Sequence, residues 1–410
     1  MKKEEKKVPQ LRFPKFKGDW EQRKFSEGVS EIGDGLHGTP IYCEDGNVYF
    51  INGNNLVDGK IVISAETKKV NESQQSTADK SLDDTTILMS INGTIGNLAY
   101  YSGERLMLGK SAAYIKVSEF DKRFVYAYLQ APSVQGYFMD SLTGTTIKNL
   151  GLKAIREMIM FIPQDVDEQK RIGKFLNHLD HLITLHQRKL EKIKKFKKGV
   201  MQKLFSQEVR FKADDGSDFP EWEEKTLSEI ASFHSGLTYT PDDVVDSENG
   251  VLVFRSSNIQ NGRICYDDNV YVDKELKEKN YVRLHDIVVC VRNGSKALVG
   301  KNALVTESDL NATWGAFMTV IRTKQNYEFV HQYLNSAFFK KEMYKDSGTA
   351  TINQITTAML NGCKLLVPSL PEQQKIADCL SSLDDVIEKQ KVTLAAWGKL
   401  KKGLLQQMFV

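Results

Sequence analysis

Two glycine-rich stretches contain residue types that could bind a nucleotide phosphate. Residues 33–38 fit the pattern G-x-G-x-x-G, but that fingerprint needs an apolar strand before it and a helix after it. Here Ser30 and Glu31 precede the glycines and Pro40 follows them. In the second stretch, five residues separate Gly103 from Gly109, where a P-loop has four. We therefore predict no nucleotide site in this chain.

The histidines and cysteines form no metal-binding or catalytic set. His186 falls on an apolar stripe while His178 and His181 lie off it, and no cysteine or carboxylate completes a ligand set. The five cysteines are scattered without a C-x-x-C pair, which favours a reducing cytoplasm. The chain has no Asn-Pro-Pro-Tyr methyltransferase motif, serine nucleophile elbow or H-E-x-x-H motif. The sequence predicts a protein without catalytic residues, metal or cofactor of its own.

The composition is that of an intracellular protein with two or three domains in its 410 residues. Its 56 basic and 53 acidic side chains nearly balance, so any surface for nucleic acid must be local. Residues 1–7 are too charged to begin a signal peptide, and no apolar run reaches the ~18 residues that a membrane span needs. We expect a soluble cytoplasmic protein with no membrane partner.

The strongest pattern in the chain is a repeat at an offset of 204 positions, which matches residues 168–205 with residues 372–409. Both segments have apolar residues at alternating spacings of three and four, as in the seam of a coiled coil. The polar interruptions match as well: His186 corresponds to Gln390, and Lys197 to Lys401. We predict two long helices that pair with each other; the alternative is two unrelated helices packed on separate cores. The expected seam residues are Ile172, Leu176, Leu179, Ile183, Leu190 and Ile193 in the first helix and Ile376, Leu380, Leu383, Ile387, Leu394 and Trp397 in the second.

We expect this helix pair to be antiparallel, because a parallel pair would force each intervening globule to span the whole coil. At ~1.5 Å per residue, each helix of roughly 38 residues would be about 57 Å long. That length would separate two sites lying about one DNA turn apart, ~34 Å.

A globular segment of mixed helix and strand pattern precedes each long helix. Short apolar runs at 48–51, 61–64, 87–91 and 113–117 predict strands, and a helix is expected over 124–139. In the second half the corresponding strands are 251–254, 287–291 and 317–321, and the helix is 329–344. The fold class is α/β (α+β), with two pseudo-repeated domains alternating with two long helices. The boundaries are a disordered tail (1–10), a first domain (11–163), a first helix (164–206), a second domain (207–368) and a second helix (369–410).

Residues 167–180 and 371–384 resemble the specificity subunits of type I restriction-modification systems. They begin Asp-Glu-Gln-Lys-Arg-Ile and Pro-Glu-Gln-Gln-Lys-Ile, and Leu-Asp follows at 179–180 and 383–384. The resemblance covers essentially the whole chain. A second similarity, at residues 34–40, includes His37, which has no obvious counterpart in the second half.

The resemblance implies a non-catalytic subunit whose globular domains are target recognition domains, each reading one half of an asymmetric, interrupted DNA target. The helices would set the spacing and dock two methyltransferase subunits, joined by restriction (translocase) subunits. S-adenosylmethionine, ATP and Mg²⁺ would belong to these partners, since the assembled complex is a DNA adenine methyltransferase and an ATP-dependent endonuclease. The rival hypothesis is a coiled-coil structural adaptor that binds proteins rather than DNA; a fused nuclease is more distant.

Polar residues at the expected turns are the candidates for contact with DNA, although each could equally be a turn or capping residue. Asn and Gln suit adenine, and Arg and Lys suit guanine. The basic run at 188–203 is either the solvated face of a coiled coil or a docking surface for an acidic partner or phosphates. The candidates are His37, Asn54, Asn55, Lys60, Asn92, Lys148 and Asn149 in the first half and Arg255, Ser257, Asn258, Arg263, Arg292, Asn293, Lys296, Asn353 and Gln354 in the second.

Overall fold

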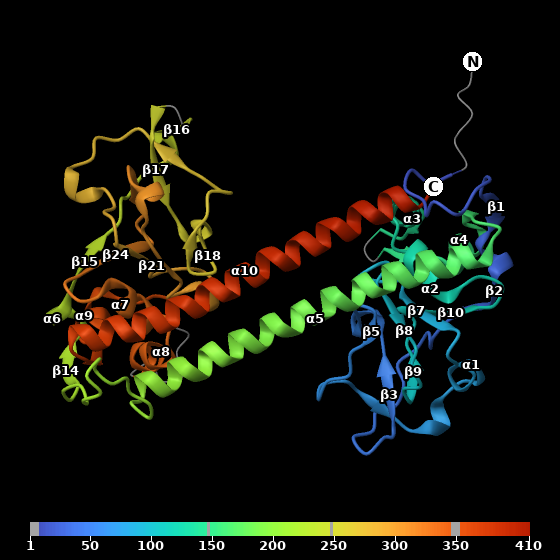
Figure 1. Cartoon of the computed structure of the whole chain (residues 1–410), viewed down its shortest axis with the longest axis horizontal. Helices are drawn as coiled ribbons and strands as arrows, with labels where there is room; N and C mark the ends of the chain where they lie inside the picture. Colours follow the sequence, from blue (N-terminus) through green and yellow to red (C-terminus); the bar gives the residue numbers. More distant parts are fainter. Residues whose placement is uncertain (1–7, 146–147, 247–248, 346–352) are drawn as a thin grey trace. The chain divides into compact units, whose positions relative to one another are not determined.

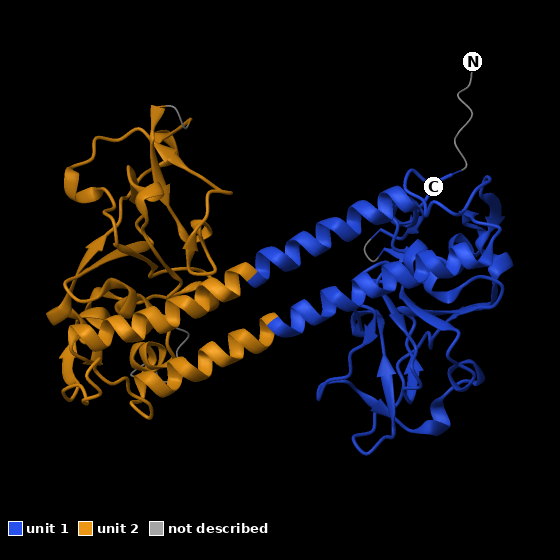
Figure 2. Ribbon diagram, in the orientation of Figure 1, with its two compact units in different colours: residues 1–189, 390–410 blue, residues 190–389 orange. Residues whose placement is uncertain are grey.

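The computed structural model describes residues 8–145, 148–246, 249–345 and 353–410 (Figure 1). Most of the tail expected at 1–10 therefore lies outside the described residues. The chain divides into two compact units (Figure 2): unit 1 comprises residues 1–189 and 390–410, and unit 2 comprises residues 190–389. Each unit thus contains one globular domain and a part of both long helices.

Unit 1 is built on a four-stranded antiparallel sheet and a three-stranded sheet. The first has the order β2 (Val29–Asp34), β10 (Ala112–Val117), β7 (Thr86–Ser90), β8 (Leu98–Tyr100). The second has the order β6 (Lys69–Val70), β3 (Val48–Ile51), β9 (Leu106–Leu108), with β3 and β9 parallel. The small pairs are β1 (Glu21–Lys24) with β13 (Ile159–Ile162), β4 (Leu56–Val57) with β5 (Lys60–Ile61), and β11 (Leu142–Thr143) with β12 (Asn149–Leu150). Its helices are η1 (Phe25–Gly28), η2 (Gly53–Asn55), η3 (Glu72–Gln74), α1 (Thr77–Lys80), α2 (Lys122–Tyr128), α3 (Pro132–Asp140), α4 (Leu152–Glu157), the first part of α5 (Val166–Phe205) and the last part of α10 (Leu370–Met408).

Unit 2 repeats this plan. Its four-stranded antiparallel sheet has the order β15 (Ala231–Ser235), β24 (Met318–Thr323), β21 (Ile287–Cys290), β22 (Asn302–Leu304). A second sheet has the order β16 (Val244–Val245), β20 (Tyr271–Val272), β17 (Val251–Phe254), β23 (Ala312–Trp314), with β17 and β23 parallel. The small pairs are β14 (Glu223–Thr226) with β25 (Lys364–Val367) and β18 (Ile259–Gln260) with β19 (Arg263–Ile264). The helices are the last part of α5, α6 (Leu227–Ile230), η4 (Pro241–Asp243), η6 (Ser256–Asn258), η7 (Glu278–Asn280), η8 (Lys296–Leu298), η9 (Glu307–Asp309), α7 (Tyr327–Leu334), α8 (Ala337–Tyr344), α9 (Thr357–Asn361) and the first part of α10 (Leu370–Met408).

Three of the expected elements differ from the structure. The helix expected over 124–139 is two helices, α2 and α3, because Pro132 starts a new helix after Ala131, whose backbone is extended. The helix expected over 329–344 is also divided, since Ser336 is extended and its hydroxyl caps α8 by accepting from Phe339 N. The strand expected over 61–64 ends at Ile61. The other expected strands are correct to within two residues at either end.

The ends of the long helices belong to the cores of the globular domains. In unit 1, Ile172 and Leu176 at the start of α5 and Phe409 beyond α10 join the core that contains Phe124. Gly173 permits this packing, because a Cβ there would lie 2.5 Å from Phe124 N. In unit 2 the core takes in Met201, Leu204 and Phe205 from α5 and Ile376, Ala377 and Leu380 from α10. The pattern at the helix ends therefore reflects packing of both long helices on a shared domain core in each unit.

Within each unit, α5 and α10 contact each other through polar side chains. In unit 1, Asp180 pairs with Lys401 at 2.5 Å, and His186 Nδ1 lies 2.6 Å from Gln390 Nε2. The partners run backwards along α10 as α5 advances, so the segments in this unit are antiparallel. In unit 2, Lys197 pairs with Asp384 at 2.5 Å. This pair and the Asp180 pair occupy equivalent repeat positions, 204 apart.

The remaining seam positions are buried to different extents. Leu179, Leu190 and Ile387 are buried, whereas the others are only half-buried, namely Ile183, Ile193, Leu383, Leu394 and Trp397. A coiled coil along the full length of both helices stays a prediction.

Candidate nucleic-acid interface

The carboxyl ends of four strands meet in unit 1. Strands β2 and β7 run in the same direction, since both are antiparallel to β10, and β3 runs parallel to β9. Backbone hydrogen bonds tie these ends together: Leu36 N donates to Leu108 O at 2.7 Å and Gly109 N donates to Ile51 O at 2.8 Å. We call the loops that follow, at 35–38, 52–55, 91–93 and 109–111, together with 148–149, the strand-end surface of unit 1.

A pocket of about 220 Å³ opens on this surface. Three predicted residues line it, His37, Asn92 and Asn149, although they come from well-separated parts of the chain. The imidazole of His37 is exposed, and its Nε2 lies 2.7 Å from Asp34 Oδ2. With the proton on Nε2 this contact is a hydrogen bond to the carboxylate, and Nδ1 is then an acceptor. Lys110 also lines the pocket and was not predicted.

Asn92 and Asn149 are held opposite each other by the backbone. They form an antiparallel bridge, and Leu150 N donates to Ile91 O at 2.9 Å. Directly paired residues of this kind place their side chains next to one another on one face. Asn92 Nδ2 also donates to Lys110 O at 3.3 Å, which orients its amide.

Unit 2 builds the same surface with the same backbone bonds. Leu237 N donates to Trp314 O at 2.7 Å, and Gly315 N donates to Phe254 O at 3.0 Å. Arg292 and Gln354 form the antiparallel bridge that Asn92 and Asn149 form in unit 1. The strand-end surface of unit 2 comprises loops 236–240, 255–258, 291–294, 315–317 and residues 353–354. Loop 291–294 and residues 353–354 bring together four predicted residues, Arg292, Asn293, Asn353 and Gln354; Asn293 N donates to Asn353 O at 3.2 Å.

The candidates in the two 3-10 turns η2 and η6 are of two kinds, some exposed to solvent and others bonded inside the turn. Asn258 is fully buried, and its amide accepts from Arg255 N and donates to Cys265 O and Asp268 O. We therefore assign Asn258 a structural role and remove it from the base-reading candidates. Asn55 makes the equivalent bonds, with Asn52 N and Val62 O. The exposed tips of the two turns are Asn54 and the partly exposed Ser257.

Several basic candidates are already engaged within the protein. Arg255 pairs with Asp268 at 2.8 Å, and Lys296 lies over the Tyr344 ring at 5.1 Å from its centroid. Arg263, on the β18–β19 hairpin, is within 3.6 Å of Asp385 on α10. Lys60 and Lys148 are exposed. The loops of the strand-end surfaces thus contain all of the candidates except Lys60, Arg263 and Lys296, although Asn55, Arg255 and Asn258 are engaged in internal contacts there.

Comparison with known proteins agrees with this arrangement. The family described as the type I restriction modification DNA specificity domain matches residues 18–195 and again residues 220–394. The chain belongs to this family. Each match takes in one globular domain together with part of the long helix that follows it.

Curated members of the specificity family are similar over most of their length. The MjaVIII specificity subunit of Methanocaldococcus jannaschii is 27% identical over 318 residues, which are 73% of this chain and 74% of the relative. The putative MjaX specificity subunit of the same organism is 27% identical over 416 residues, covering 94% and 92%. The crystal structure of the S subunit from M. genitalium has a TM-score of 0.60 and 18% identity, covering 98% of this chain and 99% of that one, so the fold is shared.

The Glu-Gln motif on which the family resemblance rests is structural in both units. Glu168 is buried and accepts from Arg12 Nε at 2.7 Å and Nη2 at 2.8 Å. Glu372 is buried and accepts from Arg210 Nε at 3.1 Å and Nη2 at 2.9 Å. In each unit an arginine in the lead-in segment is thereby fixed to the start of a long helix.

The glutamines of the motif connect each long helix to its own globular domain. Gln169 accepts from Asp121 N at 3.0 Å and donates to Pro163 O at 3.0 Å. Gln373 accepts from Asn326 N at 3.1 Å and donates to Pro368 O at 2.8 Å. Asp121 and Asn326 are the N-cap residues of α2 and α7, so the motif fixes the same junction twice.

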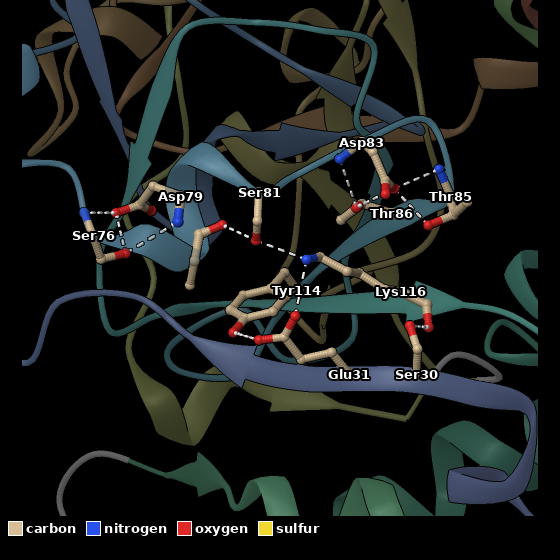
Figure 3. Close-up of polar contacts among 11 residues, drawn as sticks. Ser30, Glu31, Ser76, Asp79, Ser81, Asp83, Thr85, Thr86, Tyr114 and Lys116 are labelled. Atoms are coloured by element: carbon tan, nitrogen blue, oxygen red, sulfur yellow. Dashed lines mark hydrogen bonds and ion pairs between the residues drawn. The ribbon is translucent and has the colours of Figure 1, made fainter.

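A second polar cluster in unit 1, shown in Figure 3, also serves the fold. Glu31 accepts from the Tyr114 hydroxyl at 2.7 Å and pairs with Lys116 at 2.9 Å; these contacts, with Lys116 the larger cause, lower the pKa of Glu31. Lys116 Nζ also donates to Ser81 Oγ at 2.7 Å. The carboxylate of Asp79 caps its helix through Ser76 and accepts from Leu108 N at 2.9 Å. The Asp79 carboxylate therefore fixes the end of β9, two residues before Lys110.

The described residues hold no group of metal-ligating side chains. Across the described ranges, no helix combines the length and apolar character that crossing a membrane requires. Sequence reasoning missed Lys110 because it occurs in the stretch that fails the P-loop count; its place directly after an apolar strand and a glycine was the available signal.

Proposed function

We propose that the chain is the DNA-reading subunit of a type I restriction-modification complex. Unit 1 reads one half of an asymmetric, bipartite target and unit 2 reads the other. The observation that carries this proposal is the pair of strand-end surfaces, which share their backbone hydrogen bonds but present Asn92 and Asn149 in one unit and Arg292 and Gln354 in the other. Methyl transfer, ATP hydrolysis and cleavage belong to partner subunits, which bind S-adenosylmethionine, ATP and Mg²⁺.

An exchange of one recognition domain tests this proposal. Residues 20–160 are replaced by the corresponding segment of a relative with a known target, and the chimera is expressed with the methyltransferase subunit encoded beside it. Methylome sequencing should show that one half of the motif changes and the other half is retained. A chimera in which both halves change, or neither, contradicts independent reading by the two units.

We also propose that α5 and α10 set the distance between the two half-sites. In unit 1 the segment 179–185 of α5 faces the segment 395–401 of α10, as the Asp180–Lys401 pair indicates. Deleting both heptads removes Asp180 and Lys401 together, so neither is left without its partner, and it leaves the His186–Gln390 and Lys197–Asp384 contacts in place. Each helix becomes shorter by roughly 10 Å, equivalent to about three base pairs at ~3.4 Å. We expect a shorter spacer or loss of methylation; methylation of the original motif with its original spacer refutes the role of the helices.

The helices also carry exposed apolar side chains that suit docking of two methyltransferase subunits. Leu182 on α5 and Val386 on α10 are 39% and 44% exposed, and they occupy equivalent repeat positions. Phe196 and Leu400, 62% and 47% exposed, form a second equivalent pair. A repeated apolar site predicts two copies of the same partner, because equivalent surfaces bind equivalent subunits.

Phe196→Glu with Leu400→Glu should prevent co-elution with the methyltransferase subunit. The control is Leu310→Glu, a loop residue of unit 2 that is 40% exposed and should leave co-elution unchanged. Co-elution without sequence-specific DNA binding would favour the structural adaptor instead.

A further inference from the structure

Equivalent backbone positions in the two units carry side chains with different base-reading chemistry. Asn92 follows the end of β7 and bridges to Asn149; Arg292 follows the end of β21 and bridges to Gln354. The equivalence is set by the backbone, since Leu150 N donates to Ile91 O and Ile355 N donates to Val291 O in the same way. Each pair therefore occupies the same place on its own strand-end surface.

The hydrogen-bond donors and acceptors that these side chains leave unused define which base each can read. The amide of Asn92 uses one N–H on Lys110 O at 3.3 Å, which leaves its other N–H and its oxygen. One donor and one acceptor side by side match N7 and N6 of adenine. The amides of Asn149 and Gln354 present the same combination.

Arg292 presents only donors. Its guanidinium lies over the ring of Phe317 at 5.4 Å from the centroid, and Phe317 is itself 58% exposed. A ring on one face holds the guanidinium plane and leaves its edge N–H groups directed outward. A planar fork of donors matches O6 and N7 of guanine.

We propose that Arg292 selects a guanine in the half-site read by unit 2, whereas Asn92 selects an adenine at the equivalent position of the half-site read by unit 1. Gln354 and Asn149, directly beside them, each select an adenine. This assignment rests on the proposed DNA-reading function and adds the chemical class of base that each strand-end surface takes. It predicts an asymmetric target although the two surfaces have the same backbone arrangement.

The unaltered protein supplies the first test. The complex of the full chain with its methyltransferase subunit is titrated onto duplexes carrying the methylome-defined motif, in which single guanines of the unit 2 half-site are replaced by 7-deazaguanine. Loss of N7 at one guanine removes one of the two hydrogen bonds of the contact and should weaken binding roughly 2- to 12-fold, about half of the free energy of one bidentate base contact. If every such duplex binds like the parent, or if this half-site contains no G·C pair, the assignment of Arg292 is wrong.

Variants supply the second test. Arg292→Gln should lose discrimination for that guanine, become insensitive to the 7-deaza substitution, and leave the unit 1 half-site unchanged. Asn92→Gln, which keeps the amide, should retain adenine, and Asn92→Leu should lose it. The matched control is Arg283→Gln, an exposed arginine just before the same strand β21 that Arg292 follows.

The outcomes separate this inference from the function on which it rests. Uniform weakening of Arg292→Gln on all sequences, with a shallower salt dependence, would indicate a phosphate contact and overturn the base assignment. If the wild-type complex gives a bipartite motif that these changes do not alter, only the assignment fails. If the wild-type complex gives no bipartite motif at all, the proposed function fails.

Discussion

Replacing Arg210 by methionine should destabilise unit 2 by about 2–4 kcal/mol. The change leaves the carboxylate of Glu372 without its main partner, although this carboxylate is completely buried. Removing one member of a buried pair costs roughly 3–5 kcal/mol, and the range is reduced here because Arg210 is 21% exposed. One donor remains for Glu372, the Trp222 indole N–H at 3.0 Å.

The equivalent change in unit 1, Arg12→Met, should cost more. Glu168 is 1% exposed and its arginine 16% exposed, but among the described residues the indole nitrogen of Trp20 has no hydrogen-bond partner. The carboxylate of Glu168 would therefore lack the donor that Trp222 provides to Glu372. A hydrogen bond to a charged group contributes roughly 1.5–3 kcal/mol, which sets the expected difference between the two variants.

Native-state hydrogen exchange with mass spectrometry is the appropriate assay, because the two units need not unfold together. Peptides from α7 and β25 report on unit 2, and peptides from α2 and β13 report on unit 1. The control is Lys364→Ala, which breaks the exposed Lys364–Glu224 pair of unit 2 and should cost less than about 1 kcal/mol. The double variant Arg210→Met with Glu372→Leu should recover most of the loss. If Arg210→Met costs no more than the control, the buried pair does not hold the start of α10.

Three further predictions concern stability. Burial lowers the pKa of His331 from 6.5 to about 4. As the pH falls, the unfolded state therefore binds a proton before the folded state does, and the unfolding free energy of unit 2 should fall between pH 6.5 and pH 4 by up to about 3 kcal/mol. Unfolding free energies from hydrogen exchange at several pH values should depend less on pH in His331→Phe, and an equal dependence on pH would contradict this. Gly173→Ala should cost roughly 1–3 kcal/mol in unit 1, because its Cβ would meet Phe124 N at 2.5 Å; an unchanged melting temperature would refute the close approach. Asn258→Ala should cost roughly 1–3 kcal/mol in unit 2 and leave the methylated motif unchanged, because its amide bonds inside the turn; altered base preference would restore it as a reader.

The repeat and the long helices could be predicted because the patterns that specify them are local. Apolar spacing in α5 and α10 is periodic over many turns, and β3, β7, β10 and β17 are short apolar runs bounded by turn residues. The division of each domain helix followed from signals that were present, Pro132 in one case and the capping Ser336 in the other. An apolar stripe alone, however, does not tell a helix that packs on another helix from one that packs on a domain. Ile172 and Ile376 therefore met domain cores where a seam was expected.

The candidate site could be predicted only as a set, because burial decides the role of each polar residue. Asn54 and Asn258 are the same residue type in equivalent turns, yet the first is exposed at the tip and the second is enclosed by backbone acceptors. Periodicity gives no signal for this difference, since turns have none. Lys110 was missed for the same reason. Its place on the surface depends on Leu36 and Asn92, which are far from it in sequence but lie beside it in the structure.

Side chains hold the fold at the start of each long helix, whereas backbone bonds hold it on the strand-end surfaces. This difference explains why the helices repeat and the recognition domains differ. The side chains of the Glu-Gln motif bond to the lead-in arginine, a helix cap and a strand end, so the fold requires these residues in both copies. On the strand-end surfaces the fold is held by backbone bonds, which accept any side chain that tolerates the same backbone conformation. The equivalent positions therefore carry an asparagine, Asn92, in unit 1 and an arginine, Arg292, in unit 2, with the same backbone bonds around them. A change of side chain on a strand-end surface then requires no change of architecture.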